Sequence, residues 1–386
     1  MLQLPPLSLY IHLPWCVAKC PYCDFNSHAL KGEVPEAGYV DALLADLELD
    51  LPRVWGRTVH SVFLGGGTPS LFSGAAMDRL LAGVRALLPL APDAEITMEA
   101  NPGTVEYDRF DAYRAAGINR ISLGVQTFDD KHLKRLGRIH SGDEARRAIE
   151  AIRAAGFDNL NLDLMWALPG QSEDEALGDL SEALAFEPEH LSHYQLTIEP
   201  NTVFAARPPP LPDEDRAWEM QQACARALDS AGFEAYEISA WSRPGKSSRH
   251  NLNYWRFGDY LGIGAGAHAK ITLPAEQQVL RLRRKRVPHS YLAAASDRSF
   301  IADQRPVDAA DLAFEYFLNR LRLAEPIPWT EFEARTGLDR AAIERQVEKA
   351  EHLELLRNTP DHLIRTERGA RYLNDLQGIF LPGSSS

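Results

Sequence analysis

The feature that most constrains the fold is a repeated unit in which a short apolar run is followed by an amphipathic segment. The runs recur as far as residue 197 and read LSLYIHL, SVFLGGG, EITMEAN, NRISLGVQ, NLNLDLMW and LSHYQLT. Segments with apolar residues at helical spacing, such as YVDALLADLELDL and AMDRLLAGVRALL, lie between them. This alternation predicts an α/β protein whose strands are parallel.

Three similar segments indicate where helices end. RAAGINRISLG, RAAGFDNLNLD and DSAGFEAYEIS place Gly117, Gly156 and Gly232 where a C-cap glycine precedes the next strand. A βα repeat of about 40 residues favours a partial parallel (β/α) barrel, with an open doubly wound sheet as the competing architecture.

Polar residues and glycines follow the predicted strands. Barrels build their sites at the carboxyl ends of the strands, so we expect these side chains to meet at one mouth. The residues at these strand ends are Gly65, Gly66, Gly67, Thr68, Glu99, Asn101, Gln126 and Asp163.

The pattern changes in the second half of the chain. RPPPLPDEDRAW predicts an extended proline linker that enters a helix with acidic residues in its first turn. After about residue 300, consecutive helical patterns, the turn NTPDH, the short run LIRT and a last helix ERGARYLNDL predict a small, mostly α-helical, winged-helix-like domain. We divide the chain into a barrel, a connecting segment, a C-terminal domain and a tail, at residues 1–240, 241–300, 301–380 and 381–386.

The formal net charge of -13 argues against nucleic acid or an anionic membrane as the main partner. The start of the chain lacks the basic and apolar parts of a signal peptide, and no run is apolar for long enough to span a bilayer. We therefore expect a cytoplasmic protein. Four cysteines in such a compartment are not expected to form a disulfide framework.

Three of the four cysteines, Cys16, Cys20 and Cys23, lie within the stretch CVAKCPYCD. Structural zinc sites usually have four ligands, and no second cysteine pair follows; a redox C-x-x-C site would leave Cys16 without a role. Three thiolates suit an iron–sulfur cluster that keeps one iron open. Cys224, on an amphipathic segment, is typical of a small buried hydrophobic residue.

Other residues have side chains that suit a zwitterionic ligand with a ribose. The run GGGTPS lets the backbone approach a ligand closely, and it is not a P-loop because no Gly-Lys-Ser/Thr follows. Glu99 and Asp163 can accept hydrogen bonds from an ammonium group or from hydroxyls, Gln126 can donate and accept, and Arg138 can pair with a carboxylate.

The spacing C-x-x-x-C-x-aromatic-C, with Tyr22 as the aromatic residue, resembles the signature of the radical S-adenosylmethionine (SAM) superfamily. The resemblance implies a 4Fe-4S cluster held by Cys16, Cys20 and Cys23. In that superfamily, the amino and carboxylate groups of an exchangeable SAM chelate the fourth iron.

A closer resemblance rests on six motifs in order: YIHLPWC, GGGTPS, MEANPG, SLGVQTF, GRIH and DLMWALPG. They are similar to the oxygen-independent coproporphyrinogen III oxidase family. That resemblance implies later cofactor contacts near Thr197 and His268, and it assigns SAM binding to Tyr10, Gly66, Gly67, Thr68, Glu99, Gln126, Arg138 and Asp163.

Two features separate the chain from the oxidases. The oxidases carry a further cysteine where this chain has Phe25, and they have a longer segment ahead of the cysteine turn. The chain also carries H-N-x-x-Y-W, made by His250, Asn251, Tyr254 and Trp255. Imidazole is a good axial ligand for haem iron and aromatic rings suit a flat macrocycle, although a surface loop histidine with anchoring aromatics is the simpler alternative.

Together, Phe25 and the H-N-x-x-Y-W motif resemble the HemW-type haem chaperones, which bind haem and pass it to acceptor proteins. The resemblance implies haem, an acceptor protein and possible transient contact with a membrane-bound acceptor as partners, with His250 as the first residue to test. It does not choose between monomer and dimer. The basic run RLRRKR could contact haem propionates or an acceptor, but a solvated face is the simpler interpretation.

Three functions therefore compete. The first is a haem chaperone on a radical SAM scaffold, and the second is oxidative decarboxylation of coproporphyrinogen III propionates. The third is a DNA-binding regulator that uses the C-terminal domain and a redox cluster; the acidic chain makes it the weakest of the three. No catalytic residue is assigned.

Overall fold

The computed structural model describes residues 1–104 and 109–383, and its centre is one twelve-stranded sheet. Seven neighbouring strands of this sheet run parallel. In spatial order they are β11 (Asp259–Ile263), β1 (Leu7–Leu13), β4 (Val59–Gly66), β5 (Leu90–Ala100), β6 (Arg120–Gln126), β7 (Leu160–Trp166) and β8 (His190–Gln195).

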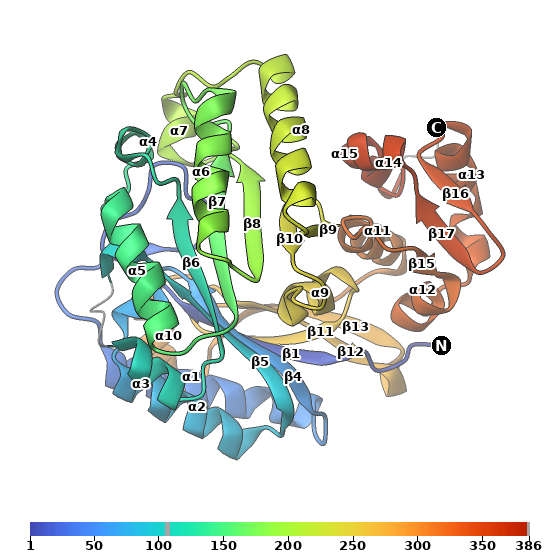
Figure 1. Ribbon diagram of the computed structural model, residues 1–386. Helices are drawn as coiled ribbons and strands as arrows, with labels where there is room; N and C mark the ends of the chain where they lie inside the picture. Colours follow the sequence, from blue (N-terminus) through green and yellow to red (C-terminus); the bar gives the residue numbers. More distant parts are fainter. Residues whose placement is uncertain (105–108, 384–386) are drawn as a thin grey trace.

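Antiparallel strands extend both edges of the parallel part. At one edge, β8 is followed by β10 (Ala240–Ser242) and β9 (Glu234–Glu237). At the other edge, β11 is followed by β12 (His268–Leu273), β13 (Gln278–Arg284) and β14 (Ile301–Pro306). Figure 1 shows that the sheet curves into an open barrel with helices along its outside, which confirms the partial (β/α) barrel.

The helices of the barrel alternate with its strands, as the sequence predicts. They are α1 (Glu36–Asp50), α2 (Gly74–Leu87), α3 (Arg109–Ala115), α4 (Asp130–Arg135), α5 (Gly142–Ala154), α6 (Glu173–Ala185), α7 (Val203–Ala206), α8 (Glu214–Ser230), α9 (Arg249–Trp255) and α10 (Pro288–Ala293).

Local signals account for where these helices start and stop. Ser141 and Ser172 each form a capping box at the start of α5 and α6. Gly117, Gly156 and Gly232 follow α3, α5 and α8 with φ of 100°, 82° and 79°, which confirms their predicted role as C-cap glycines. Cys224 is buried in α8, as expected.

The parallel strands are buried on both faces. In β1, for example, Leu9 and Ile11 are fully buried, and most of β6 and β7 is buried in the same way. A strand that is covered on both sides reads as a near-continuous apolar run, which buried polar residues such as Ser8, Ser61 and Asn161 interrupt. Because the strands run parallel, their carboxyl ends lie at one rim.

The C-terminal region is built around a second hydrophobic core, in which Phe317 stacks on Phe380 at 4.0 Å between ring centroids and to which Leu2, Phe257 and Val279 also contribute. Its helices are α11 (Ala309–Arg320), α12 (Trp329–Thr336), α13 (Glu344–His352), α14 (Glu367–Arg371) and α15 (Leu373–Gly378). Its small sheet has the order β15 (Ile327–Pro328), β17 (His362–Arg365) and β16 (Leu356–Asn358).

This region confirms the small, mostly helical C-terminal part, with one correction. The last predicted helix is wrong as a single element, because Tyr372 leaves the helical conformation, with φ -109° and ψ 46°, between α14 and α15. Of the predicted tail, residues 384–386 lie outside the described residues.

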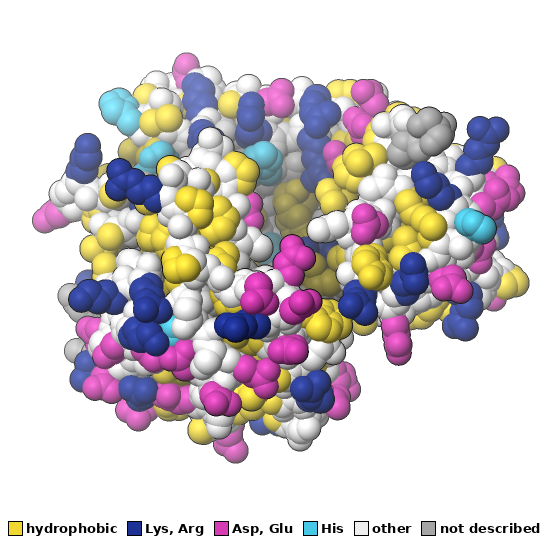
Figure 2. All heavy atoms as spheres, turned by 90° about the horizontal axis from the view of Figure 1, so that it is seen from above, with side chains coloured by type: hydrophobic (Ala, Val, Ile, Leu, Met, Phe, Trp, Pro, Cys, Tyr) yellow, Lys and Arg dark blue, Asp and Glu magenta, His cyan; other side chains and the backbone are white. Residues whose placement is uncertain are grey.

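The surface is hollowed between the barrel and the C-terminal region, with hydrophobic side chains on the floor of the hollow (Figure 2). Within residues 1–104 and 109–383, no helix has both the length and the apolar character needed to cross a bilayer.

Candidate functional site

The cysteine turn follows β1 and is held by short strands and backbone hydrogen bonds. β2 (Trp15–Cys16) pairs with β3 (His28–Ala29), and the Thr68 amide donates to the carbonyl oxygen of Trp15 at 2.7 Å. Within the turn, the Cys23 amide donates to the carbonyl oxygen of Cys20 at 3.2 Å. Cys16, Cys20 and Cys23 are all free thiols of intermediate exposure, and they line one cavity of about 140 Å³.

The structure brings most of the predicted strand-end residues to this same cavity, which we call the cysteine cavity. They come from the carboxyl ends of four neighbouring strands, β4 to β7, and from the segments that follow them, as expected for a βα barrel. Those that line it are Gly66, Gly67, Thr68, Glu99, Asn101, Gln126, Arg138 and Asp163.

Gly66 lies at a position where any other residue would be strained and would clash with a neighbour. Its φ is +112°, and a Cβ there would lie 2.3 Å from a carbon of the His12 ring. Its amide donates to Glu99 Oε2 at 3.0 Å. The glycine therefore allows a close approach of backbone, imidazole and carboxylate at the edge of the cavity.

Glu99 and Asp163 are partly buried carboxyl groups on neighbouring sides of the cavity. Burial raises the pKa of Glu99 to about 7, against the lowering effect of the Gly66 amide, and the nearby Asp163 raises it further. Burial also raises the pKa of Asp163, although Asn161 and Ser122 donate to its carboxylate at 2.8 and 3.1 Å. Both groups would lose part of this desolvation penalty next to a cationic ligand.

Gln126 and Arg138 are held rigidly. Gln126 has a positive φ of 71°, and the Tyr194 hydroxyl donates to its Oε1 at 2.7 Å. Arg138 donates to the carbonyl oxygen of Gly124 at 2.8 Å, to Cys20 Sγ at 3.6 Å and to Asn101 Oδ1. Its Nε is buried and, among the described residues, lacks a hydrogen-bond partner, which is a donor left over for a ligand.

A larger cavity of about 830 Å³ lies beside the cysteine cavity, and we call it the aromatic cavity. Phe25, Gly66 and Glu99 line both cavities. Tyr10, which the sequence grouped with the SAM-binding residues, lines the aromatic cavity and is absent from the lining of the cysteine cavity. Its hydroxyl donates to His12 Nδ1 at 2.9 Å, because His12 Nε2 is committed to the carbonyl oxygen of Asn26 at 3.0 Å.

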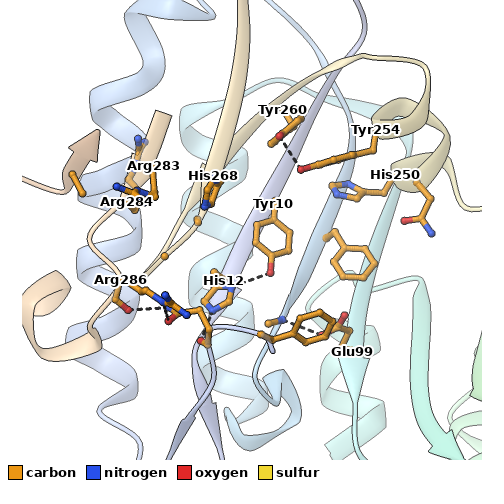
Figure 3. Close-up of a pocket in the computed structure, with 18 of the residues that line it drawn as sticks. Tyr10, His12, Glu99, His250, Tyr254, Tyr260, His268, Arg283, Arg284 and Arg286 are labelled. Atoms are coloured by element: carbon orange, nitrogen blue, oxygen red, sulfur yellow. Dashed lines mark hydrogen bonds between the residues drawn. The ribbon is translucent and has the colours of Figure 1, made fainter. Parts of the chain in front are cut away.

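His250 lies on the wall of the aromatic cavity. It sits in α9 and not in a loop, and it is only 5% exposed, so the alternative of a surface loop histidine is wrong. Its ring points into the cavity (Figure 3), 5.0 Å from the centroid of Phe63. Its Nδ1 lies 3.2 Å from Ser61 Oγ, whereas its Nε2 has no hydrogen-bond partner in the described part of the chain.

The burial of His250 has an electrostatic consequence. It lowers the pKa of the imidazole to about 3, so the ring is neutral at physiological pH. A neutral imidazole with a free nitrogen is the form that binds a metal without first losing a proton.

The rest of the H-N-x-x-Y-W motif shares this cavity. Asn251, Tyr254 and Trp255 line it together with His250. Tyr254 stacks on Tyr260 at 4.3 Å between centroids, and its hydroxyl donates to that of Tyr260 at 2.8 Å. The motif therefore forms an aromatic wall around the histidine.

The basic run RLRRKR divides its side chains between the interior and the cavity. The interpretation as one solvated face is wrong for Arg284, which is fully buried and pairs with Asp46 Oδ1 at 2.7 Å and with Asp50. Arg283 and Arg286 are exposed and line the aromatic cavity on the side opposite His250 (Figure 3).

Comparison with known proteins agrees with this arrangement. Residues 10–183 match the family model of the radical SAM superfamily, and residues 307–372 match that of the HemN C-terminal domain. The structure superposes on coproporphyrinogen III oxidase (HemN) from Escherichia coli with a TM-score of 0.83 at 22% sequence identity, over 98% of this chain and 90% of that one. The fold is therefore that of the radical SAM proteins.

Full-length relatives are more similar in sequence. The chain is 55% identical to the heme chaperone HemW of Escherichia coli K12, over 99% of this chain and 100% of the relative. It is 38% identical to the heme chaperone HemW of Mycobacterium tuberculosis H37Rv, over 94% and 92% of the two chains. The chain belongs to the HemW family.

The match of residues 10–183 to the radical SAM family model implies a 4Fe-4S cluster and SAM for this HemW-family chain. The residues of the cysteine cavity fit such a pair: three free thiols share one small cavity, next to a half-buried guanidinium with an unsatisfied Nε and two desolvated carboxyl groups. The two later contacts that the sequence resemblance implied lie elsewhere. His268 lines the aromatic cavity, while Thr197 is exposed and bonds Glu199.

Several residues of the HemW-family site carry no signal in the sequence. Tyr194, Tyr260 and Ser61 each bond a predicted site residue or a neighbour of one, and they come from β8, β11 and β4. Single tyrosines and serines in apolar strands are ordinary core residues, so only the alternating direction of strand side chains could have pointed to them.

Proposed function

We propose that the chain binds haem in the aromatic cavity, with Nε2 of His250 as an axial ligand, and passes the haem to an acceptor protein. The observation that carries the proposal is a buried, neutral histidine whose free nitrogen faces a cavity of about 830 Å³. Membership of a family whose named members are heme chaperones supports the same function.

The walls of the aromatic cavity suit a flat, amphipathic macrocycle. Phe25, Phe63, Tyr254 and Trp255 supply aromatic surface, and Arg283 and Arg286 supply cations on the side opposite His250. Carboxylate groups such as haem propionates are natural partners for these exposed guanidinium groups.

We further propose that Cys16, Cys20 and Cys23 hold a 4Fe-4S cluster and leave one iron for SAM. SAM would contact Gly66, Gly67, Thr68, Glu99, Gln126, Arg138 and Asp163, with Tyr10 approaching from the aromatic cavity. The cluster supplies one-electron chemistry when it is bound. The chain's residues orient the cofactor: Gly66 permits close contact, and the carboxyl groups favour a cationic ligand.

We assign a separate task to each of the predicted regions. We propose that residues 1–240 hold the cluster and SAM, that residues 241–300 supply the haem ligand, and that residues 301–380 take part in handing haem to the acceptor. We place this activity in the cytoplasm, where free thiols such as those of the cysteine turn stay reduced. The working protein is a monomer or a dimer.

A haem titration of the cluster-reconstituted protein, followed by absorbance, tests this function. We expect one haem per chain, and we expect His250→Ala to weaken binding strongly. His289→Ala, at an exposed position outside both cavities, is the matched control and should bind like the wild type. Equal affinity of His250→Ala and the wild type would refute the proposed ligand.

Anaerobic incubation with coproporphyrinogen III and SAM separates the chaperone from an oxidase. A chaperone gives no decarboxylated product. Robust turnover by a protein that does not bind haem would overturn the proposal.

A further inference from the structure

A chain of three polar side chains continues from His250 into the barrel. His250 Nδ1 lies 3.2 Å from Ser61 Oγ, Ser61 Oγ lies 2.7 Å from Ser8 Oγ, and Asn253 Nδ2 donates to Ser8 Oγ at 2.8 Å. Ser8 and Ser61 are each 1% exposed, on the adjacent strands β1 and β4.

The helix that carries His250 is itself held firmly at the start of this chain. Glu95 on β5 accepts hydrogen bonds from the backbone amides of Arg249 and His250 and from the Ser248 hydroxyl, at 3.1 to 3.2 Å. Asn253, one turn after His250, also donates to the carbonyl oxygen of Asp259 at 2.9 Å. The imidazole is therefore fixed relative to Ser61.

Each hydroxyl has one proton, so the chain has two self-consistent arrangements. In the first, His250 Nδ1–H donates to Ser61, Ser61 donates to Ser8, and Nε2 presents its lone pair to the aromatic cavity. In the second, Ser8 donates to Ser61, Ser61 donates to Nδ1, and Nε2 carries the proton. The Asn253 amide donates to Ser8 in both arrangements, so it does not choose between them.

The first arrangement requires a hydrogen-bond acceptor for the Ser8 hydroxyl. Ser8, Ser61 and Asn253 line a further cavity of about 490 Å³, which Glu325 and Glu331 of the C-terminal region also line. A polar cavity of this size has room for water, and water there accepts the Ser8 proton in the first arrangement.

We propose that Ser61 and Ser8 are positioning residues that hold His250 in the Nδ1–H tautomer, so that Nε2 is ready to ligate haem iron. This inference rests on the proposed function, because it takes haem iron as the ligand of Nε2. Ligating histidines generally donate their other N–H to a fixed acceptor, and loss of that acceptor typically costs about 10–100-fold in metal affinity. Here the acceptor is a buried hydroxyl pair.

A matched pair of variants tests the proposal. Ser61→Thr keeps the hydroxyl. Ser61→Val introduces a side chain of nearly the same shape as threonine but without the hydroxyl, and both threonine and valine suit a buried strand. We expect Ser61→Val to bind haem about 10-fold or more weakly, and Ser61→Thr to bind within about 3-fold of the wild type. Ser8→Ala should fall between them, because Ser61 then keeps its place but loses its acceptor.

The second readout needs no haem. Nitrogen-15 NMR of the haem-free protein, with the His250 signals assigned by their loss in His250→Ala, reports which ring nitrogen carries the proton. We expect Nδ1–H in the wild type and in Ser61→Thr, and a shift toward Nε2–H in Ser61→Val. A wild type with Nε2–H, or a tautomer that is the same in all three proteins, would overturn the inference.

The outcomes separate this inference from the proposed function. If His250→Ala binds haem as the wild type does, the ligand assignment fails. If His250→Ala loses haem while Ser61→Val and Ser61→Thr bind it equally well, the function stands and the positioning role is wrong. Urea unfolding of each variant checks that a weaker affinity is not a loss of fold.

Discussion

Arg138 donates a hydrogen bond to the sulfur of Cys20 over 3.6 Å, although 118 positions separate the two residues. The same guanidinium donates to the carbonyl oxygen of Gly124 at the end of β6. The loop after α4 is thereby fixed between the cysteine turn and the sheet. Hydrogen bonds to cluster sulfurs and nearby charge set the reduction potentials of iron–sulfur proteins, so this contact bears on the electronics of a bound cluster.

We expect Arg138→Leu to lower the midpoint potential of the reconstituted cluster, because a positive charge favours the more negative, reduced form. The shift should be on the order of tens of millivolts, where 59 mV is equivalent to a tenfold change for one electron. Potentiometric titration monitored by electron paramagnetic resonance measures it. Lys134→Leu, which removes an exposed charge on α4, is the control. Identical potentials in both variants would contradict the prediction.

Replacement of Cys16, Cys20 or Cys23 by Ala should abolish the visible absorbance of the reconstituted cluster, because each supplies one of only three thiolates. Cys224→Ala should keep the full absorbance, since that thiol is buried in α8. Iron and sulfide analysis provides an independent count. A triad variant that retained the cluster would show that its cysteine is not a ligand.

Gly66→Ala should reduce SAM binding and destabilise the fold by more than about 1 kcal/mol, because φ is +112° and the new Cβ would overlap His12. Gly178→Ala, in the middle of α6 with open space around it, should be stabilising by about 0.5–1 kcal/mol. Urea unfolding and equilibrium dialysis with labelled SAM check both. Normal SAM affinity in Gly66→Ala would rule out a steric requirement.

The affinity for SAM should rise with pH between 6 and 8. Burial raises the pKa of Glu99 to about 7, so below that pH the group is mostly neutral, and the cationic SAM favours the carboxylate. The expected gain approaches tenfold per pH unit below the pKa and then levels off. Glu99→Gln should bind weakly with a flatter profile; an unchanged profile would assign the dependence to another group.

The same raised pKa has the opposite effect on the cofactor-free fold. A carboxyl group whose folded pKa exceeds its unfolded value stabilises the fold at low pH, and this contribution is lost as pH rises through about 7. Between the ordinary pKa of a glutamate, 4.5, and about 7, the unfolding free energy of Glu99→Gln should therefore depend less on pH than that of the wild type.

Arg284→Met should destabilise the protein by about 3–5 kcal/mol, because it leaves the buried carboxylate of Asp46 without its cation and leaves Asp50 with Arg53 alone. Arg298→Met, which removes an ion pair to Glu48 between side chains that are 54% and 41% exposed, should cost less than about 1 kcal/mol. The difference between their urea midpoints is the measurement. Equal costs would mean that Arg284 is not the anchor between β13 and α1.

Much of the barrel follows from local sequence. Glycines such as Gly117 and Gly156 end helices for reasons contained in a few residues, and fully buried parallel strands produce the apolar runs. The meeting of the strand-end side chains at the cysteine cavity also follows, because the carboxyl ends of parallel strands share one rim.

Other features depend on contacts between distant segments, and the sequence does not contain them locally. Arg284 looks solvated within RLRRKR, but Asp46 and Asp50, more than 200 residues away, draw it into the interior. His250 looks like a loop residue until Glu95 and Ser248 are seen to hold the start of α9. The sequence resemblance groups Tyr10 with the SAM-binding residues. Side chains of a strand alternate between its two faces, however, and that of Tyr10 lies on the side of the aromatic cavity.

The cysteine cavity and the aromatic cavity share a wall made by Phe25, Gly66 and Glu99. Binding in one cavity can therefore be coupled to binding in the other. A ligand that reorganises this wall from one side changes the free energy of binding on the other. By reciprocity, whatever factor SAM applies to the affinity for haem, haem must apply to the affinity for SAM. Under the proposed function, a haem affinity that differs with and without SAM would show this coupling directly.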